Sequence, residues 1–118
     1  MSENVFVLVI AEADFPEDGK YTATVNGWNI LIARADGAYH AFNDRCPHAA
    51  SLLSPGRVRR GHILCPLHGA MFNLATGANV GGTYDALRTF PLKLEDGQIA
   101  VAVPTENPGM ADLAIKIL

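Results

Sequence analysis

The chain has 118 residues, the length of one ordinary domain. Its composition is 49% hydrophobic and 18% charged, so it can bury a core and is not expected to be disordered. Nine Lys and Arg against 12 Asp and Glu give a net charge of −3, which argues against the basic surplus of a nucleic-acid-binding protein.

The first apolar run, Val5 to Ala11, has the composition of an export signal but not its flanks. No basic residue precedes it, acidic Glu12 and Asp14 follow it, and it is far shorter than the ~20 apolar residues that span a bilayer. We therefore expect a cytoplasmic protein with no membrane anchor. In that reducing compartment two cysteines are more often ligands or reactive thiols than a disulfide.

Short apolar stretches alternate with turns rich in Gly, Asp, Asn and Pro along the rest of the chain, a pattern typical of an all-β domain. Ala35-Asp36-Gly37 and Glu95-Asp96-Gly97 predict hairpin turns, because glycine accepts the positive φ that such turns need. The tail, 104–118, is ambiguous and fits a helical turn at 109–113 followed by a strand at 114–118. The expected strands are 5–11, 21–25, 28–33, 39–43, 61–65, 70–74, 89–94 and 98–103, and in 28–33 Trp28, Ile30 and Ile32 share one face.

Both cysteines and three of the four histidines fall within residues 46–69, CPHAASLLSPGRVRRGHILCPLHG. Cys46-Pro-His48 and Cys65-Pro-Leu-His68 each place a thiol and an imidazole on a loop between strands. The four side chains could hold one zinc ion, although structural zinc sites more often pair two cysteines in one loop. They could also have no joint role. In a third interpretation they hold a [2Fe-2S] cluster, with both cysteines on one iron and both histidines on the other, which explains the repeated motif because each loop then serves both irons.

The pattern Cys46-x-His48 and Cys65-x-x-His68 strongly resembles the Rieske iron–sulfur signature. The segments 35–42, ADGAYHAF, and 69–77, GAMFNLATG, extend the resemblance, which covers residues from about 5 to 103. It implies an all-β fold, a Rieske-like antiparallel β-sandwich with a small cluster-binding subdomain formed by loops at about 44–56 and 63–72. It also implies a single Rieske domain over 1–118 and one [2Fe-2S] cluster on Cys46, His48, Cys65 and His68.

Rieske proteins of cytochrome complexes join their ligand loops by a disulfide and place a serine after the second motif. The corresponding residues here are Ser51, Leu67 and Ala70, so the bridge and the hydroxyl are both missing. With fewer hydrogen-bond donors around the sulfides, we expect a reduction potential near the low end of the Rieske range, roughly −150 mV.

The chain instead resembles the soluble Rieske ferredoxins of bacterial ring-hydroxylating dioxygenase systems, which serve aromatic hydrocarbon catabolism. That resemblance implies a one-electron carrier from an NAD(P)H-dependent flavoprotein reductase to a terminal oxygenase, with no nucleic-acid, membrane or small-molecule partner. The chain is not expected to be an enzyme, because only His40 and His62 remain for the two-histidine, one-carboxylate iron site of an oxygenase. The alternatives are the small subunit of an assimilatory nitrite reductase or other oxidoreductase and, outside the family, a structural zinc module.

Several other residues carry weaker expectations. The run Arg57, Arg59, Arg60 is interpreted as a solvated loop, with contact to an acidic partner as the second possibility. Family members have prolines in the loop after the second motif, whereas 81–86 reads GGTYDA, with Tyr84 a candidate lid over the cluster. We expect core aromatics at Trp28, Tyr21 and Phe42 and core or cluster-shielding side chains at Leu52, Leu53 and Leu67. At Gly56 and Gly69 we expect either tight turns or backbone N–H groups that approach the cluster sulfides.

Overall fold

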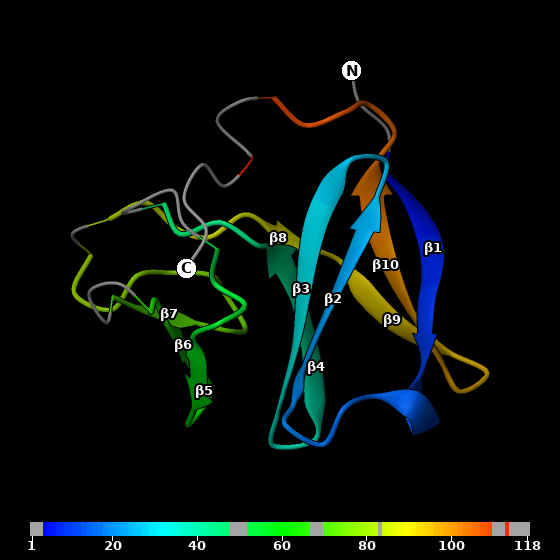
Figure 1. The fold of residues 1–118 in the computed structure, drawn as a ribbon, viewed down its shortest axis with the longest axis horizontal. Helices are drawn as coiled ribbons and strands as arrows, with labels where there is room; N and C mark the ends of the chain where they lie inside the picture. The colour runs from blue at the N-terminus through cyan, green and yellow to red at the C-terminus, as the bar shows by residue number, and fades with distance from the viewer. Residues whose placement is uncertain (1–3, 48–51, 67–69, 83, 110–112, 114–118) are drawn as a thin grey trace.

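The computed structural model describes residues 4–47, 52–66, 70–82, 84–109 and 113. The predicted all-β fold is confirmed, because within these residues the only helical element is the short 3-10 turn η1 (Glu12–Asp14). All strand pairs of the described residues are antiparallel, and their strands form three sheets (Figure 1). The strands are β1 (Asn4–Ala11), β2 (Lys20–Val25), β3 (Trp28–Ala35), β4 (Ala38–Asn43), β5 (Arg57–Arg59), β6 (His62–Leu64), β7 (Met71–Asn73), β8 (Thr89–Phe90), β9 (Leu92–Glu95) and β10 (Gln98–Pro104).

Two sheets form the base of the molecule, with strand orders β2-β3-β4-β8 and β1-β10-β9. They enclose an apolar core that includes Trp28, Ile30 and Ile32 from β3 and Ile99 and Val101 from β10. The predicted alternation along β3 is confirmed. Because successive side chains of a strand point to opposite faces, Leu31 and Ala33 enter a second core on the other side of the sheet.

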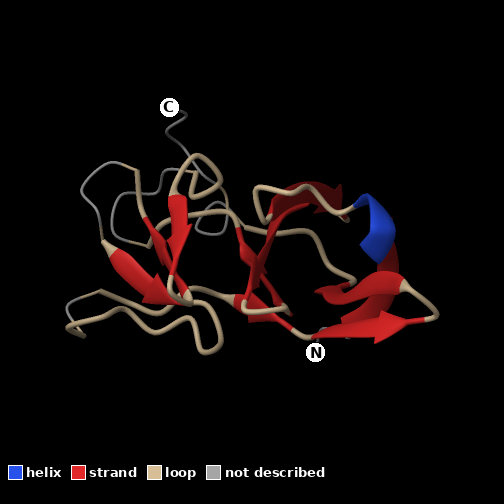
Figure 2. Ribbon diagram, turned by 90° about the horizontal axis from the view of Figure 1, so that it is seen from below, coloured by secondary structure: helices blue, strands red, loops and turns tan. Residues whose placement is uncertain are grey.

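Residues 44–88 form an insertion between two neighbouring strands. β4 pairs with β8 through Ala41–Phe90 and Phe42–Thr89, and the Asn43 N–H donates to the Arg88 carbonyl at 2.8 Å. The insertion contains the third sheet, β5-β6-β7, which lies to one side of the two base sheets in both ribbon views (Figures 1 and 2). Val58, Ile63 and Phe72 are paired across this sheet and face the second core.

The structure corrects two predictions of strand extent. Residues 57–59 were expected in a loop but form β5, whose hairpin turn to β6 has Arg60 at φ +50° and Gly61 at φ +77°. Residues 89–94 were expected as one strand but divide at Pro91. Proline lacks the N–H that a continuous ladder needs, and here the chain passes from the four-stranded sheet (β8) to the three-stranded one (β9).

The segment after β10 runs back along the β2–β3 hairpin. Asn26 Nδ2 donates to the Pro104 carbonyl at 3.2 Å, and Trp28 Nε1 donates to the Glu106 carbonyl at 3.0 Å. The helical turn predicted at 109–113 falls mostly outside the described residues, and the strand predicted at 114–118 falls wholly outside them. In the described part of the chain, no helix is long and apolar enough to cross a membrane.

Candidate metal centre

The two cysteines enter the same buried core from different strands. Cys46 follows β4 by three residues and is 0% exposed, whereas Cys65 directly follows β6 and is 1% exposed. Both belong to the second core, with Leu53, Ile63, Phe72 and Leu74 among its members, and they are not joined in a disulfide. The structure thus places both cysteines of the motif in one core, with no disulfide between them.

The histidines of the predicted ligand set, His48 and His68, lie outside the described residues, as do Leu67 and Gly69. No group of three or more metal-ligating side chains occurs within the described ranges, which contain only the two cysteines of the four proposed ligands. The ligand set therefore remains a prediction from the motif.

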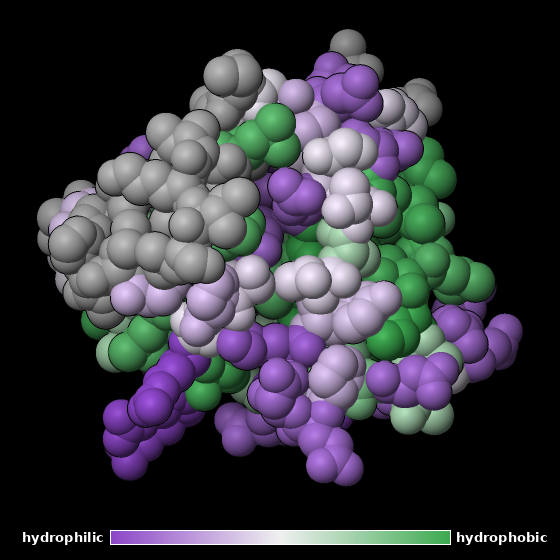
Figure 3. Space-filling model, in the orientation of Figure 1, coloured by the Kyte–Doolittle hydropathy of each residue, from purple (hydrophilic) through white to green (hydrophobic). Residues whose placement is uncertain are grey.

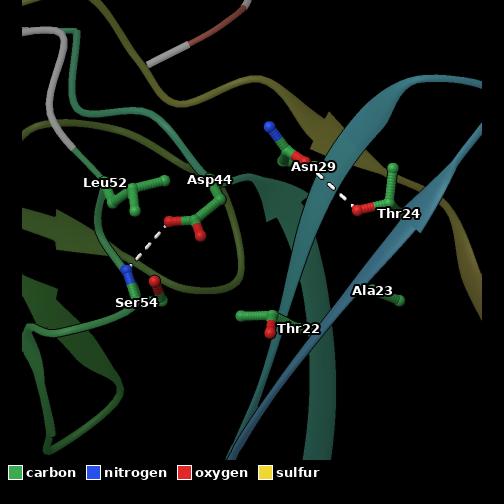
Figure 4. Close-up of a pocket in the computed structure, with 7 residues that line it drawn as sticks. All are labelled: Thr22, Ala23, Thr24, Asn29, Asp44, Leu52 and Ser54. Carbon is green, nitrogen blue, oxygen red and sulfur yellow. Dashed lines mark hydrogen bonds between the residues drawn. The ribbon is translucent and has the colours of Figure 1, made fainter. Parts of the chain in front are cut away.

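A buried carboxylate organises the first cysteine loop. Asp44 is 4% exposed, and its Oδ1 accepts the backbone N–H groups of Leu53 at 2.7 Å and Ser54 at 2.8 Å. Its own N–H donates to the Asn29 carbonyl on β3 at 2.8 Å. Figure 4 shows Asp44 reaching across to Ser54 beside a surface hollow of about 430 Å³, with Thr22 and Thr24 of β2 on the other side. Asp44 thus joins the two ends of the loop that carries Cys46 and ties them to the base sheet.

A lysine from the base sheet fixes the same turn from the carbonyl side. Lys20 Nζ, at the start of β2, donates to the carbonyls of Ser54 at 2.7 Å and Gly56 at 2.6 Å. Ammonium-to-carbonyl hydrogen bonds of this length are charge-assisted and stronger than neutral ones. The turn 53–56 is therefore held on both sides: the carboxylate of Asp44 accepts from its N–H groups, and the ammonium group of Lys20 donates to its carbonyls.

Gly56 connects this turn to the second cysteine loop. A Cβ at this position would overlap the carbonyl oxygen of Leu64 and lie 2.9 Å from that of Leu53. Leu64 immediately precedes Cys65, whose N–H donates to the Ala70 carbonyl at 2.8 Å across the base of the second loop. The tight turn predicted at Gly56 is confirmed, and the close packing of Gly56 against Leu64 positions the strand that leads into Cys65. The approach of backbone N–H groups to the cluster sulfides, the other expectation for Gly56, stays a prediction.

Sequence reasoning missed Asp44 and Lys20. Their partners are main-chain atoms of a turn 9 to 36 residues away, so no side-chain pattern marks the contacts. The signals present were an acidic residue just before the first cysteine motif and the turn-forming pair Pro55-Gly56 after it.

Most of the other side chains considered in the sequence analysis pack in the protein core or against it. Trp28 and Phe42 are buried as predicted, Tyr21 is partly buried against the base core, and Leu53 packs in the core that holds both cysteines. His40 is half-buried on β4, and this burial lowers its pKa below the ordinary histidine value. His62 lies on β6 with Nδ1 2.9 Å from the Arg60 carbonyl. Tyr84 is 39% exposed, and its role as a lid remains a prediction.

Comparisons with known proteins identify the family. Residues 5–91 match the Rieske [2Fe-2S] domain. The chain is 35% identical over 98 residues to the 3-phenylpropionate/cinnamic acid dioxygenase ferredoxin subunit of Escherichia coli K12, covering 81% of this chain and 92% of that protein. It is also 34% identical over 88 residues to mouse apoptosis-inducing factor 3, but that match covers 72% of this chain and only 14% of the longer protein.

Solved structures share the fold. A ferredoxin–oxygenase complex of carbazole 1,9a-dioxygenase contains a chain that aligns with a TM-score of 0.76 and 25% identity, over 89% of this chain and 97% of that one. A nitrite reductase small subunit from Mycobacterium tuberculosis aligns with a TM-score of 0.75 over 85% of this chain and 96% of that one, and at 20% identity it supports the fold alone. The chain therefore belongs to the Rieske [2Fe-2S] domain family, carries one Rieske-type cluster as its cofactor, and is homologous to a dioxygenase ferredoxin component.

Proposed function

We propose that this protein is a one-electron carrier that takes electrons from an NAD(P)H-dependent flavoprotein reductase and passes them to the terminal oxygenase of a ring-hydroxylating dioxygenase system. The match along 92% of a dioxygenase ferredoxin subunit carries this proposal. The solved complex of a ferredoxin with the carbazole dioxygenase oxygenase supports an oxygenase as the acceptor. The cytoplasm is the proposed location, because its reducing conditions keep ligand thiols reduced.

The two irons of the proposed cluster differ in the type of residue that would bind them. The thiolates of Cys46 and Cys65 would hold one iron, and the imidazoles of His48 and His68 would hold the other, within a single domain, 1–118. When bound, the cluster accepts and releases one electron at a potential raised by its two neutral imidazole ligands. Leu53, Ile63 and Phe72 surround the cysteines and keep water from the thiolates.

The residues around the ligand loops keep these loops in fixed positions. Asp44, Lys20 and Gly56 fix the turn 53–56 against both cysteine loops. A ligand frame that does not rearrange between redox states keeps electron transfer fast, because little solvent or protein must reorganise. We place the electron exit at the imidazole edges of His48 and His68, where partners dock through a small, transient interface.

The test begins with the purified protein. Metal analysis is expected to find iron and acid-labile sulfide rather than zinc, and NADH is expected to reduce the protein only when a separate reductase is added. His48→Ala and His68→Ala are each expected to lose the Rieske EPR spectrum of the reduced protein, because each removes an iron ligand. His62→Ala, which changes a histidine outside the motif pattern, is the matched control and should retain it. A His48→Ala or His68→Ala protein that keeps the spectrum and electron transfer, or a preparation that contains zinc, contradicts the proposal.

The small subunit of a nitrite reductase is the second candidate, because a protein of that description shares the fold. The two functions predict different behaviour on purification. A carrier purifies alone and exchanges electrons with separate proteins, whereas a permanent subunit purifies with its large subunit.

A further inference from the structure

We propose that the outer face of the β5-β6-β7 sheet is a docking surface for an acidic region of a redox-partner protein. We name it the arginine face and define it by Arg57, Arg59, Arg60, His62, Leu64 and Met71. The inference deepens the proposed function, on which it rests, by assigning a second contact surface beside the ligand loops and the chemistry of the partner that fits it.

Strand register places these side chains on one face. Arg57 pairs with Leu64, which pairs with Met71, and Arg59 pairs with His62. Directly paired residues of antiparallel strands share a face. The intervening row, Val58, Ile63 and Phe72, packs into the core that contains the cysteines. The arginine face is therefore the opposite, outward side of the sheet whose inner side covers Cys46 and Cys65.

The face concentrates positive charge on a chain whose net charge is −3. Arg57, Arg59 and Arg60 are all exposed, and in the described part of the chain none of the three side chains forms an ion pair or hydrogen bond. The nearby carboxylate of Asp18 borders the same hollow as Arg57 and Arg59, but its Oδ1 accepts the Lys20 N–H at 3.1 Å. In Figure 3 a hydrophilic projection extends at lower left, where Figure 1 shows the tip of β5.

Two hollows give the face an apolar centre that reaches a cysteine loop. One, of about 310 Å³, is lined by Arg59, Arg60, His62, Leu64 and Met71. The other, of about 300 Å³, is lined by Pro55, Gly56, Arg57, Leu64, Cys65 and Pro66. Leu64 borders both, so the surface continues from the arginines to Cys65. An apolar centre inside a charged rim is the anatomy of a protein–protein interface.

Charge complementarity selects the partner. Exposed guanidinium groups pair best with carboxylates, and such rim charges mainly accelerate encounter, which is what a shuttling carrier requires. A nucleic acid is disfavoured, because the face offers only three arginines, whereas proteins that bind DNA typically make roughly 6–10 phosphate contacts. The partner is therefore an acidic protein surface that meets the second cysteine loop from the side of β6.

The experiment mixes the dithionite-reduced holoprotein with the acidic protein cytochrome b5, or with the basic protein cytochrome c, in a stopped-flow instrument over a range of salt concentrations. Arg57→Gln/Arg59→Gln tests the face. Arg34→Gln/Lys93→Gln, on strands β3 and β9 of the base, changes the net charge equally and is the control. Arg60→Glu is a second test that leaves both strands unchanged. Cluster content of every variant is checked by its absorption spectrum.

We expect the second-order rate constant with cytochrome b5 to fall as salt rises, and to fall roughly five- to tenfold at low salt in Arg57→Gln/Arg59→Gln. The control pair should change it less than twofold, and cytochrome c should show no loss. Equal effects of the two double variants, no effect of either, or reduction of cytochrome c but not of cytochrome b5 overturns the docking surface. Failure of the wild-type protein to reduce either cytochrome instead overturns the carrier function.

Discussion

Replacing Asp44 tests whether one buried carboxylate holds the first cysteine loop closed. Asp44→Ala removes two charge-assisted hydrogen bonds, of 2.7 and 2.8 Å, and leaves the N–H groups of Leu53 and Ser54 without an acceptor. At about 1.5 kcal/mol for each bond, the loss is about 3 kcal/mol. Asp44→Asn retains an oxygen acceptor but loses the charge, so its expected loss is about half as large.

The rate of cluster loss reports this difference, because unfolding of a cluster protein is not a reversible two-state process. The assay follows bleaching of the visible absorption in a fixed concentration of urea. If the loop opens before the cluster leaves, about 3 kcal/mol accelerates bleaching by up to about 150-fold for Asp44→Ala, and the Asn variant by about tenfold. Asp85→Ala, which removes an exposed carboxylate in the 81–86 loop, is the control. Bleaching of Asp44→Ala within twofold of the wild-type rate refutes the reasoning.

Two further predictions concern the strand into Cys65 and the effect of pH. Gly56→Ala is expected to prevent cluster uptake or to accelerate bleaching in the same urea assay by more than about 150-fold, because its methyl group meets the fixed Leu64 carbonyl at a cost of more than about 3 kcal/mol. Gly61→Ala, at φ +77° with no described atom within 4 Å, should cost only about 1–2 kcal/mol and accelerate bleaching by no more than about 5- to 30-fold, and equal rates would contradict the steric argument. Burial lowers the pKa of His40, so the unfolded chain binds a proton at higher pH than the folded protein does. Stability contributed by neutral His40 is therefore present above about pH 6.5 and is lost as the pH falls toward the lowered pKa. Between pH 7.5 and 5.5 the melting temperature of His40→Gln should fall less than that of the wild type, and parallel declines would show that His40 does not contribute.

The sequence was sufficient for most of the fold because its signals were local. Alternation placed Trp28, Ile30 and Ile32 on one face of β3, and the Asp-Gly pairs marked two hairpin turns. The sequence did not predict the elements whose structure depends on contacts between residues far apart in the chain. β5 carries only one inward apolar residue, Val58, between two arginines, so its strand character depends on pairing with β6. The division at Pro91 depends on two sheets that the chain joins only after folding.

The functional site, like the fold, was predicted from the sequence only in part. The repeated motif predicted that Cys46 and Cys65 act together, and both lie in one buried core. The motif did not predict the roles of Asp44 and Lys20, because both bind main-chain atoms. Every residue carries these atoms, so such contacts leave no pattern of residue types in the sequence. The positions of His48 and His68 stay predictions from the motif.

The ends of the insertion lie side by side, because the Asn43 N–H donates to the Arg88 carbonyl. A protein engineer could therefore replace residues 44–87 by a short turn or by a foreign segment that joins Asn43 to Arg88, where the pairing of β4 with β8 already brings the two strands together. The new segment would need an apolar face of its own, because Leu31, Ala33 and Phe42 would otherwise be exposed to water.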